Sequence, residues 1–375
     1  MKIIKILFLL AFILPIITVA QTKATVTIKN NSALDRKETV VTIKWATISN
    51  AYPQIDTSNF VVINGNTKKQ IAYQLEHKGT TAIQNLLVQV DLKAKSTLTL
   101  LIQKGKPAPF TAKTYARYVP ERLDDFAWEN DKIAFRAYGK ALEKTEGDAY
   151  GYDVWVKRID KMILNDRYKR NEYHIDHGDG LDYYHVGYTL GAGNMAPFVN
   201  DTIRYSANYH QWKMLDNGPL RSTFQLTFDT WNAGGIKVKA TKTISIDAGS
   251  QLNRIENNYT FDNNKPLPVV VGIIRREKPG VISLNEQQGV MGYWEPTEKE
   301  GTTGVGSILT TPVSTMSVNK TQILAKTTVN NNEPIVYYSG AAWDKAGKIT
   351  NSKQWFHYLN HFYQQLQNPL IVIVK

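Results

Sequence analysis

Apolar and polar residues alternate in short runs along most of the chain. From Ala24 to about Lys104 the runs include TVTIK, ETVVTIKW, NFVVING and STLTLLIQ, and Asn, Gly, Ser and Asp stand between them. Because successive side chains of a strand point to opposite faces, this period of two predicts antiparallel strands joined by turns. The pattern continues after residue 116 in KIAFRAYG, RSTFQLTFDTW, IKVKATKTISIDA and EPIVYYSG.

A helical pattern replaces the alternation in two places. Ser352 to Gln367 (SKQWFHYLNHFYQQLQ) has the clearer helical period, parts of Asp153 to Tyr173 have a weaker one, and a last strand, LIVIV, follows the first of these. Lys106 to Ala116 contains two prolines and indicates a connector. We predict an all-β protein, a large antiparallel β-sandwich of the supersandwich kind with a few short helices. An N-terminal β-strand region, 21–108, should pack onto a main catalytic sandwich, 109–375.

The first twenty residues have the features of a secretory signal peptide. Lys2 and Lys5 precede an apolar run that Pro15 interrupts, and Thr18 to Ala20 offers a small-residue cleavage site. The apolar run is short for a bilayer span, no cysteine for lipidation follows it, and no later stretch is apolar enough to cross a membrane. We therefore expect residues 1–20 to be removed and the protein to be periplasmic or secreted.

Charge and composition narrow the classes of partner. The 375 residues include 45 Lys and Arg, 33 Asp and Glu and no cysteine, for a formal charge of +12, and loss of the two signal-peptide lysines leaves 12 − 2 = +10. A basic exported protein favours an anionic partner. The lack of cysteine excludes disulfides, thiolate catalysis and thiolate-held metals. No nucleic-acid reader motif or nucleotide-binding loop occurs, so we expect neither nucleic acid nor an organic cofactor. The oligomeric state is left open.

One glycine-bearing segment concentrates acid–base side chains. Four of the seven histidines lie between Tyr173 and Trp212, and the segment begins YHIDHGDGLDYYHVG. Three interpretations are open: acid–base catalysis, a metal site, or a tight turn that its histidines stabilise by hydrogen bonds. The spacing matches neither HExxH nor a calcium loop. We predict His174, His177 and Tyr184 as the acid–base groups and no metal.

Basic and aromatic residues upstream offer groups for substrate binding. Arginine can bind a carboxylate or sulfate through two parallel hydrogen bonds, and tryptophan offers a flat face to a sugar ring. The candidates are Arg122, Trp128, Arg136, Lys157 and Arg158. A structural network of arginines and carboxylates beside a buried tryptophan explains Arg122, Trp128 and Arg136 at least as well. For Lys157 and Arg158 the alternative is a solvated basic face.

Several long strings along the chain are distinctive. They are PERLDDFAWENDKIAFRAYG from Pro120, DVWVKR from Asp153, YHIDHGDGLDYYHVGYTLGAGNMAP from Tyr173, NGPLRSTFQL from Asn217, TKTISIDAGSQLNR from Thr241, MGYWEP from Met291 and YYSGAAWDKAG from Tyr337. These strings resemble a family of exported bacterial proteins that was long described as a domain of unknown function and that includes the oligosaccharide dehydratase of ulvan-degrading polysaccharide utilization loci. The resemblance implies removal of water from the non-reducing-end uronate of an anionic, sulfated oligosaccharide, and it assigns no catalytic residue.

The sequence leaves two other functions open. A polysaccharide lyase would use the same acid, base and cation and would expel a neighbouring sugar in place of water. An exported oligosaccharide-binding protein would use the aromatic residues and arginines but would need no pair of His and Tyr.

Overall fold

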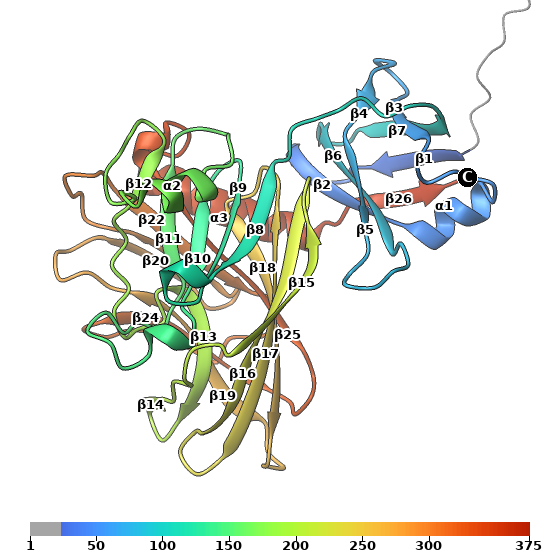
Figure 1. Cartoon of the computed structure of the whole chain (residues 1–375). Helices are drawn as coiled ribbons and strands as arrows, with labels where there is room; N and C mark the ends of the chain where they lie inside the picture. The colour runs from blue at the N-terminus through green and yellow to red at the C-terminus, as the bar shows by residue number, and fades with distance from the viewer. Residues whose placement is uncertain (1–23) are drawn as a thin grey trace, which may run out of the picture.

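The computed structural model describes residues 24–375, and the signal-peptide prediction for residues 1–20 lies outside them. Within the described range the chain forms an N-terminal lobe and a larger sandwich (Figure 1). The lobe packs two sheets around an apolar core, with helix α1 (Trp45–Ala51) at one side. Its sheets have the orders β26 (Ile371–Val374), β1 (Ala24–Lys29), β7 (Thr97–Lys104), β3 (Phe60–Asn64), β4 (Gln70–Ile71) and β2 (Arg36–Lys44), β6 (Asn85–Leu92), β5 (Tyr73–Glu76).

The larger part consists of three antiparallel sheets around one large core. The site sheet has the order β12 (Gly180–Asp182), β11 (Asp153–Lys157), β10 (Ala134–Ala137), β9 (Asp125–Asn130), β8 (Thr114–Val119). A second sheet has the order β14 (Thr202–Ile203), β13 (Ala192–Val199), β19 (Leu267–Ile274), β24 (Gln322–Val329), β23 (Thr315–Val318). The large sheet has the order β15 (Gln211–Asn217), β16 (Arg221–Asn232), β17 (Lys237–Asp247), β18 (Leu252–Phe261), β25 (Ile335–Trp343), β22 (Thr303–Leu309), β21 (Val290–Trp294), β20 (Val281–Asn285).

Short helices cover parts of the outer faces. Helix α2 (Leu164–Arg170) packs on the site sheet, and α3 (Ser352–Gln367) packs on the large sheet through Trp355 and Leu359. Asn351 begins α3 by accepting a hydrogen bond from the Gln354 amide at 3.0 Å. Single turns of 3-10 helix occupy Pro120–Arg122, Lys140–Leu142 and Asp344–Ala346. None of the helices between residues 24 and 375 is both long and apolar enough to cross a bilayer.

The predicted fold class is confirmed, and so is the helix at Ser352–Gln367. The weaker helical pattern in 153–173 forms a helix only at α2. The position of the last strand corrects the predicted division of the chain. Strand β26 pairs with β1 of the N-terminal lobe, with Val374 opposite Val26, and does not join the 109–375 sandwich. Figure 1 shows this red strand among the blue strands of the lobe. The division at residue 108 otherwise stays a prediction.

Candidate active site

Charged side chains from four neighbouring strands meet on one face of the site sheet. The register places Arg136 of β10 opposite Asp153 of β11, and Asp182 of β12 opposite Trp155. The alternate residues Phe135, Val154 and others point into the main core, so the period of two turns the charged residues toward α2. Together with Asp125 of β9, these residues form what we call the Arg136 cluster: Asp125, Arg136, Asp153 and Asp182.

The Arg136 guanidinium lies among three carboxylates. Its Nη2 is 2.6 Å from Asp153 Oδ2 and 3.0 Å from Asp182 Oδ2, and its Nη1 is 3.5 Å from Asp125 Oδ2. All four side chains are buried. Arg122 adds a second cation 3.7 Å from Asp125. Three carboxylates against two guanidinium groups leave the buried cluster one negative charge in excess.

Burial and this excess favour a bound proton. Burial, opposed by Arg136 and Arg122, raises the pKa of Asp125 to about 6. Burial and the neighbouring Asp182 raise the pKa of Asp153 well above its ordinary value, although Arg136 acts in the opposite sense. Carboxyl groups that hold protons near neutral pH are typical of acid–base sites, and structural ion-pair networks also produce them.

Aromatic rings enclose the guanidinium on its other sides. The Arg136 Cζ lies 5.1 Å from the ring centroid of Trp155, 5.3 Å from that of Tyr138 and 5.9 Å from that of Tyr173. Tyr173 also stacks on Trp155, with centroids 5.0 Å apart. These cation–π contacts stabilise a cation that is removed from water. They also fix the position of Tyr173, the residue next to His174.

His174 lies where the Arg136 cluster meets solvent. Its Nδ1 donates to the carbonyl oxygen of Asp182 at 2.8 Å and lies 3.8 Å from Asp182 Oδ2, while 69% of the side chain is exposed. A carbonyl oxygen only accepts hydrogen bonds, so the Nδ1 atom carries the hydrogen. In the neutral imidazole the lone pair then lies on Nε2, which is the atom free to act as a base. Asp182 thus connects an exposed base to the buried carboxylates.

The other two predicted acid–base residues lie elsewhere. His177 is on the same loop, but its Nε2 contacts Glu172 Oε2 at 3.2 Å. Tyr184 is only 2% exposed, and the Arg276 guanidinium stacks on its ring at 4.6 Å. Burial raises the pKa of Tyr184 well above its ordinary value. Of the three predicted groups, His174 is the one that contacts the Arg136 cluster. The mechanism proposed below uses His174 alone, and the catalytic roles predicted for His177 and Tyr184 stay untested.

The structure corrects the predicted substrate-binding set at Trp128 and Lys157, because both side chains are buried. Trp128 is fully buried in the main core, where its Nε1 donates to Asn253 Oδ1 at 2.8 Å. The buried Lys157 ammonium donates to Glu129 Oε2 at 2.7 Å and to the Asn130 carbonyl at 2.6 Å. Neither side chain reaches the surface. Trp128 thus fits the alternative of a buried tryptophan, and Lys157 does not belong to the solvated basic face that was its alternative.

The three predicted arginines have different surroundings. Arg136 is held by carboxylates of the chain itself, whereas Arg122 keeps 26% of its side chain exposed and lies beside Tyr173. Arg158 is 35% exposed, forms an ion pair with Asp176 and stacks on Trp343 at 4.9 Å. Arg158 follows Asp153 by five residues, which is roughly 16 Å along a strand. The structure therefore groups Arg122 and Arg136 with Asp125, whereas Arg158 contacts Asp176 of the His174 loop and has no ion pair with the Arg136 cluster.

Sequence reasoning missed Asp125, Asp153 and Asp182 as a group. The signal was present in DVWVKR, where Asp153, Trp155 and Lys157 alternate with valines. Polar residues on one face of a strand normally indicate that this face is exposed to solvent. Here helix α2 and the loop that follows it cover the face. Between residues 24 and 375 no group of three or more His, Asp or Glu side chains has a metal-binding arrangement. The guanidinium of Arg136 lies among the three carboxylates.

Comparison with known proteins gives the family. Residues 28–372 match the model described as "Domain of unknown function (DUF4861)". The chain belongs to the DUF4861 family. A relative from Formosa agariphila, described as "Uncharacterized protein P7", is 30% identical to this DUF4861 chain over an alignment of 379 positions that covers 93% of each protein.

Solved structures share the fold of this DUF4861 chain at low sequence identity. A protein in the glycosyl hydrolase family 38 from Enterococcus faecalis superposes with a TM-score of 0.54 at 10% identity over 94% of the chain. An α-mannosidase from Enterococcus faecalis V583 gives 0.53 at 10% identity over 95%. The chain spans 47% and 46% of these two proteins, about half of their length. At this identity the likeness establishes the fold and no residue role.

Proposed function

We propose that this protein is an exported dehydratase that removes water from the non-reducing-end uronate of ulvan-type sulfated oligosaccharides. The observation that carries the proposal is the position of His174, an exposed side chain whose Nδ1 contacts Asp182 of a buried cluster that favours a bound proton. The resemblance of the long sequence strings supplies the reaction type. The two structures of the same fold are named as carbohydrate-active proteins, which accords with a sugar substrate.

The reaction needs a base, an acid and a cation. The base takes the proton from carbon 5 of the uronate, which is acidic because it adjoins the carboxylate. The electron pair of that C–H bond forms the double bond between carbons 4 and 5 as the bond from carbon 4 to its hydroxyl breaks. The hydroxyl gains a proton and leaves as water. The cation stabilises the negative charge that develops on the carboxylate.

His174 fits the roles of base and acid in turn. In glucuronate the carbon-5 hydrogen and the carbon-4 oxygen lie on the same face of the ring, so one imidazole can take the proton and return it to the leaving hydroxyl. The Asp182 carbonyl orients the ring, and the Asp182 carboxylate at 3.8 Å stabilises the imidazolium between the two steps. Arg122, partly exposed beside Tyr173, is the cation that we assign to the substrate carboxylate.

The products distinguish the dehydratase from the two alternatives. The purified protein is incubated with ulvan oligosaccharides of graded length, and product masses are followed together with the absorbance of the conjugated double bond. We expect each substrate to lose about 18 mass units, one water, without becoming shorter. Two shorter products with the same chromophore would identify a lyase. No change in mass or absorbance would contradict an enzyme and favour a binding protein.

Metal dependence is tested in the same assay. Because Arg136 lies among the three carboxylates, we expect full activity after treatment with EDTA. Loss of activity that divalent metal restores would mean that the histidine and aspartate side chains bind a metal, and that His174 is not the base.

A further inference from the structure

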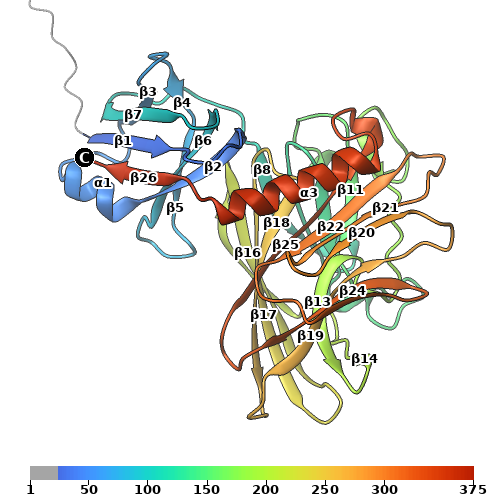
Figure 2. The same cartoon turned by 180° about the vertical axis from the view of Figure 1, so that it is seen from behind.

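A long groove lies on the other side of the sandwich from α2. It has a volume of ≈ 1340 Å³ and runs between the N-terminal lobe, the outer face of the large sheet and α3. Figure 2 shows α3 crossing the outer face of the sheet and leading into the lobe. Pockets for drug-sized ligands measure about 300–1,000 Å³, so the groove has room for more than one sugar ring. No residue of the Arg136 cluster lines it.

Hydroxyl and amide side chains form the floor of the groove. Thr223 and Gln225 of β16 and Thr243 and Ser245 of β17 point outward, because the residues between them are buried in the main core. Thr223 Oγ1 lies 3.0 Å from Ser245 Oγ, and Gln225 Nε2 donates to Thr243 Oγ1 at 3.2 Å. Such groups both donate and accept hydrogen bonds. They suit the hydroxyls of a sugar chain.

The charges that line the groove are unbalanced toward cations. The lining contains Arg36, Lys37, Lys78, Lys132, Arg221, Arg254 and Lys348 against Asp35, Glu38, Glu76, Asp247 and Glu256, a difference of 7 − 5 = +2 before either lining histidine is counted. Every one of these acids is already in an ion pair: Glu38 with Lys132, Glu76 and Asp247 with Arg221, Glu256 with Arg254, and Asp35 with Lys93. Each of these acids therefore has a cationic partner within the protein, although Glu76 and Asp247 share Arg221.

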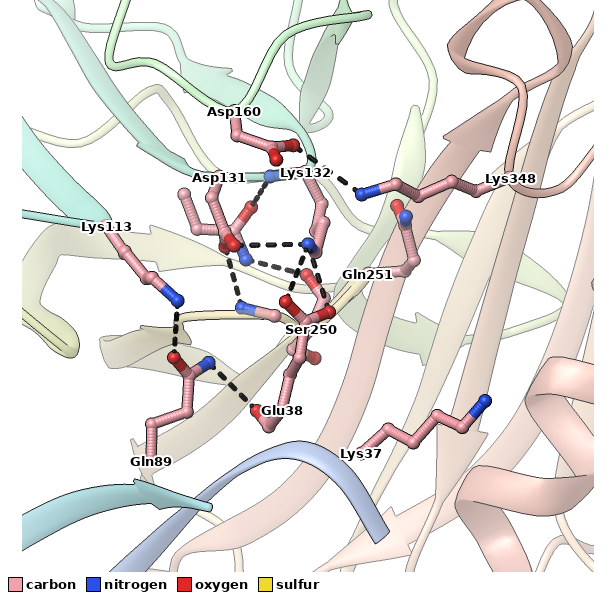
Figure 3. A network of polar contacts seen from close by, with 12 residues as sticks. Lys37, Glu38, Gln89, Lys113, Asp131, Lys132, Asp160, Ser250, Gln251 and Lys348 are labelled. Atoms are coloured by element: carbon pink, nitrogen blue, oxygen red, sulfur yellow. Dashed lines mark hydrogen bonds and ion pairs between the residues drawn. The ribbon is translucent and has the colours of Figure 1, made fainter. Parts of the chain in front are cut away.

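Three lysines remain available to a ligand. Lys37 and Lys78 have no ion pair with any residue of the described range 24–375, and Lys348 is paired only with the exposed Asp160, at 3.5 Å. Lys37 belongs to the N-terminal lobe and Lys348 to the sandwich. Figure 3 shows these two side chains on either side of the polar network around Lys132.

Fixed contacts hold the two walls of the groove together. Lys132 Nζ lies 3.0 Å from Glu38 Oε2 in the lobe and 3.1 Å from Asp131 Oδ2 in the sandwich (Figure 3). Arg36 donates to the carbonyl of Gln365 at 3.1 Å in the last turn of α3, where a cation is favoured by the helix dipole. A groove of fixed width loses less entropy when it binds a ligand.

We propose that this groove binds an anionic oligosaccharide segment, a sulfated or uronate-bearing one, at a second site separate from His174. The unpaired lysines bind the sulfate or carboxylate groups and the floor binds the sugar hydroxyls. The proposal rests on the proposed function for its choice of polymer but not for its geometry.

The test compares affinities in a background that does not consume the ligand. The host is the His174→Ala variant, and the ligand is a purified sulfated ulvan oligosaccharide, with its desulfated form as the comparison. Three proteins are titrated by calorimetry: the host, the host with Lys37→Ala, Lys78→Ala and Lys348→Ala, and the host with Lys239→Ala, Lys265→Ala and Lys320→Ala. The last set removes the same charge from exposed lysines outside the groove.

We expect the groove set to weaken binding of the sulfated ligand by about ten-fold, with a shallower dependence on salt, and the control set to change it little. Desulfation should have the same effect as the groove substitutions. Equal losses in both sets, no loss in either, or no binding to the host would overturn the groove proposal. The product-mass assay is separate: if it fails while the groove binds, the protein is an oligosaccharide-binding protein.

Discussion

Lys242 is a buried cation without a carboxylate partner in the described chain. It lies inside the sandwich, where its Nζ donates to Asn194 Oδ1 at 2.5 Å and to the Met195 carbonyl at 3.0 Å. Burial lowers the pKa of this ammonium to about 7. The unfolded chain keeps an ordinary lysine with a pKa of 10.5. Between these two values the unfolded state binds more protons, so folding stability rises as the pH increases from 7 to 10.5.

The substitution Lys242→Met should remove this dependence on pH. Methionine keeps the length and removes the charge, so the variant should gain most, relative to wild type, at pH 7 and below. The difference in unfolding free energy should shrink by about 3 kcal/mol between pH 7 and pH 9.5. Urea unfolding of both proteins at the two pH values measures it, and other titrating groups cancel in the comparison. A difference that does not change with pH would contradict a depressed lysine pKa.

Individual site residues were predictable only where the pattern shows exposure. His174 stands in a glycine-bearing loop, and its location at the surface agrees with that pattern. Trp128 stands in a strand with both faces buried, one by the core and one by α2 and its loop. An alternating sequence cannot distinguish this strand from one that faces water. The tryptophan therefore resembled a sugar-binding residue until the packing was known.

Among the elements, α3 was predictable and the partner of β26 was not. Trp355 and Leu359 are four residues apart, so they lie on the same face of the helix and give a local signal. The pairing of β26 with β1 joins residues at opposite ends of the chain, and nothing in either strand specifies it. It also covers the edge of β1 and makes β26 the outer strand of that sheet.

Removal of residues 369–375 should loosen the N-terminal lobe and leave the sandwich folded. The deletion exposes one edge of β1, including the amide of Thr25 that now donates to the Lys375 carbonyl at 2.8 Å. Hydrogen exchange should become faster in β1 and β7, while β16 to β18 stay protected. Lys375→Ala keeps the backbone bonds and is the matched control. Unchanged protection of β1 after the deletion would contradict this role for the strand.

At the scale of the whole molecule, the Arg136 cluster and the groove lie on different faces of the sandwich. The Arg136 cluster lies under α2, and the groove lies under α3 beside the lobe. The alternation of apolar and polar residues predicted the all-β class and the sandwich. It did not show how many polar faces of the strands are covered by other elements. For that reason the sequence indicated a basic protein with an anionic partner and could not locate the cations that stay unpaired.

The difference between His174 and His177 tests the active-site assignment most directly. The two residues share one loop, yet only His174 contacts Asp182, whereas His177 contacts Glu172. Turnover of one ulvan oligosaccharide by wild type, His174→Ala and His177→Ala should show a loss of about 100-fold or more in kcat/KM for the first variant. The second should stay within a few-fold of wild type, with both variants as stable as wild type in thermal unfolding. Full activity of His174→Ala, or equal losses in both variants, would contradict the assignment of the active site.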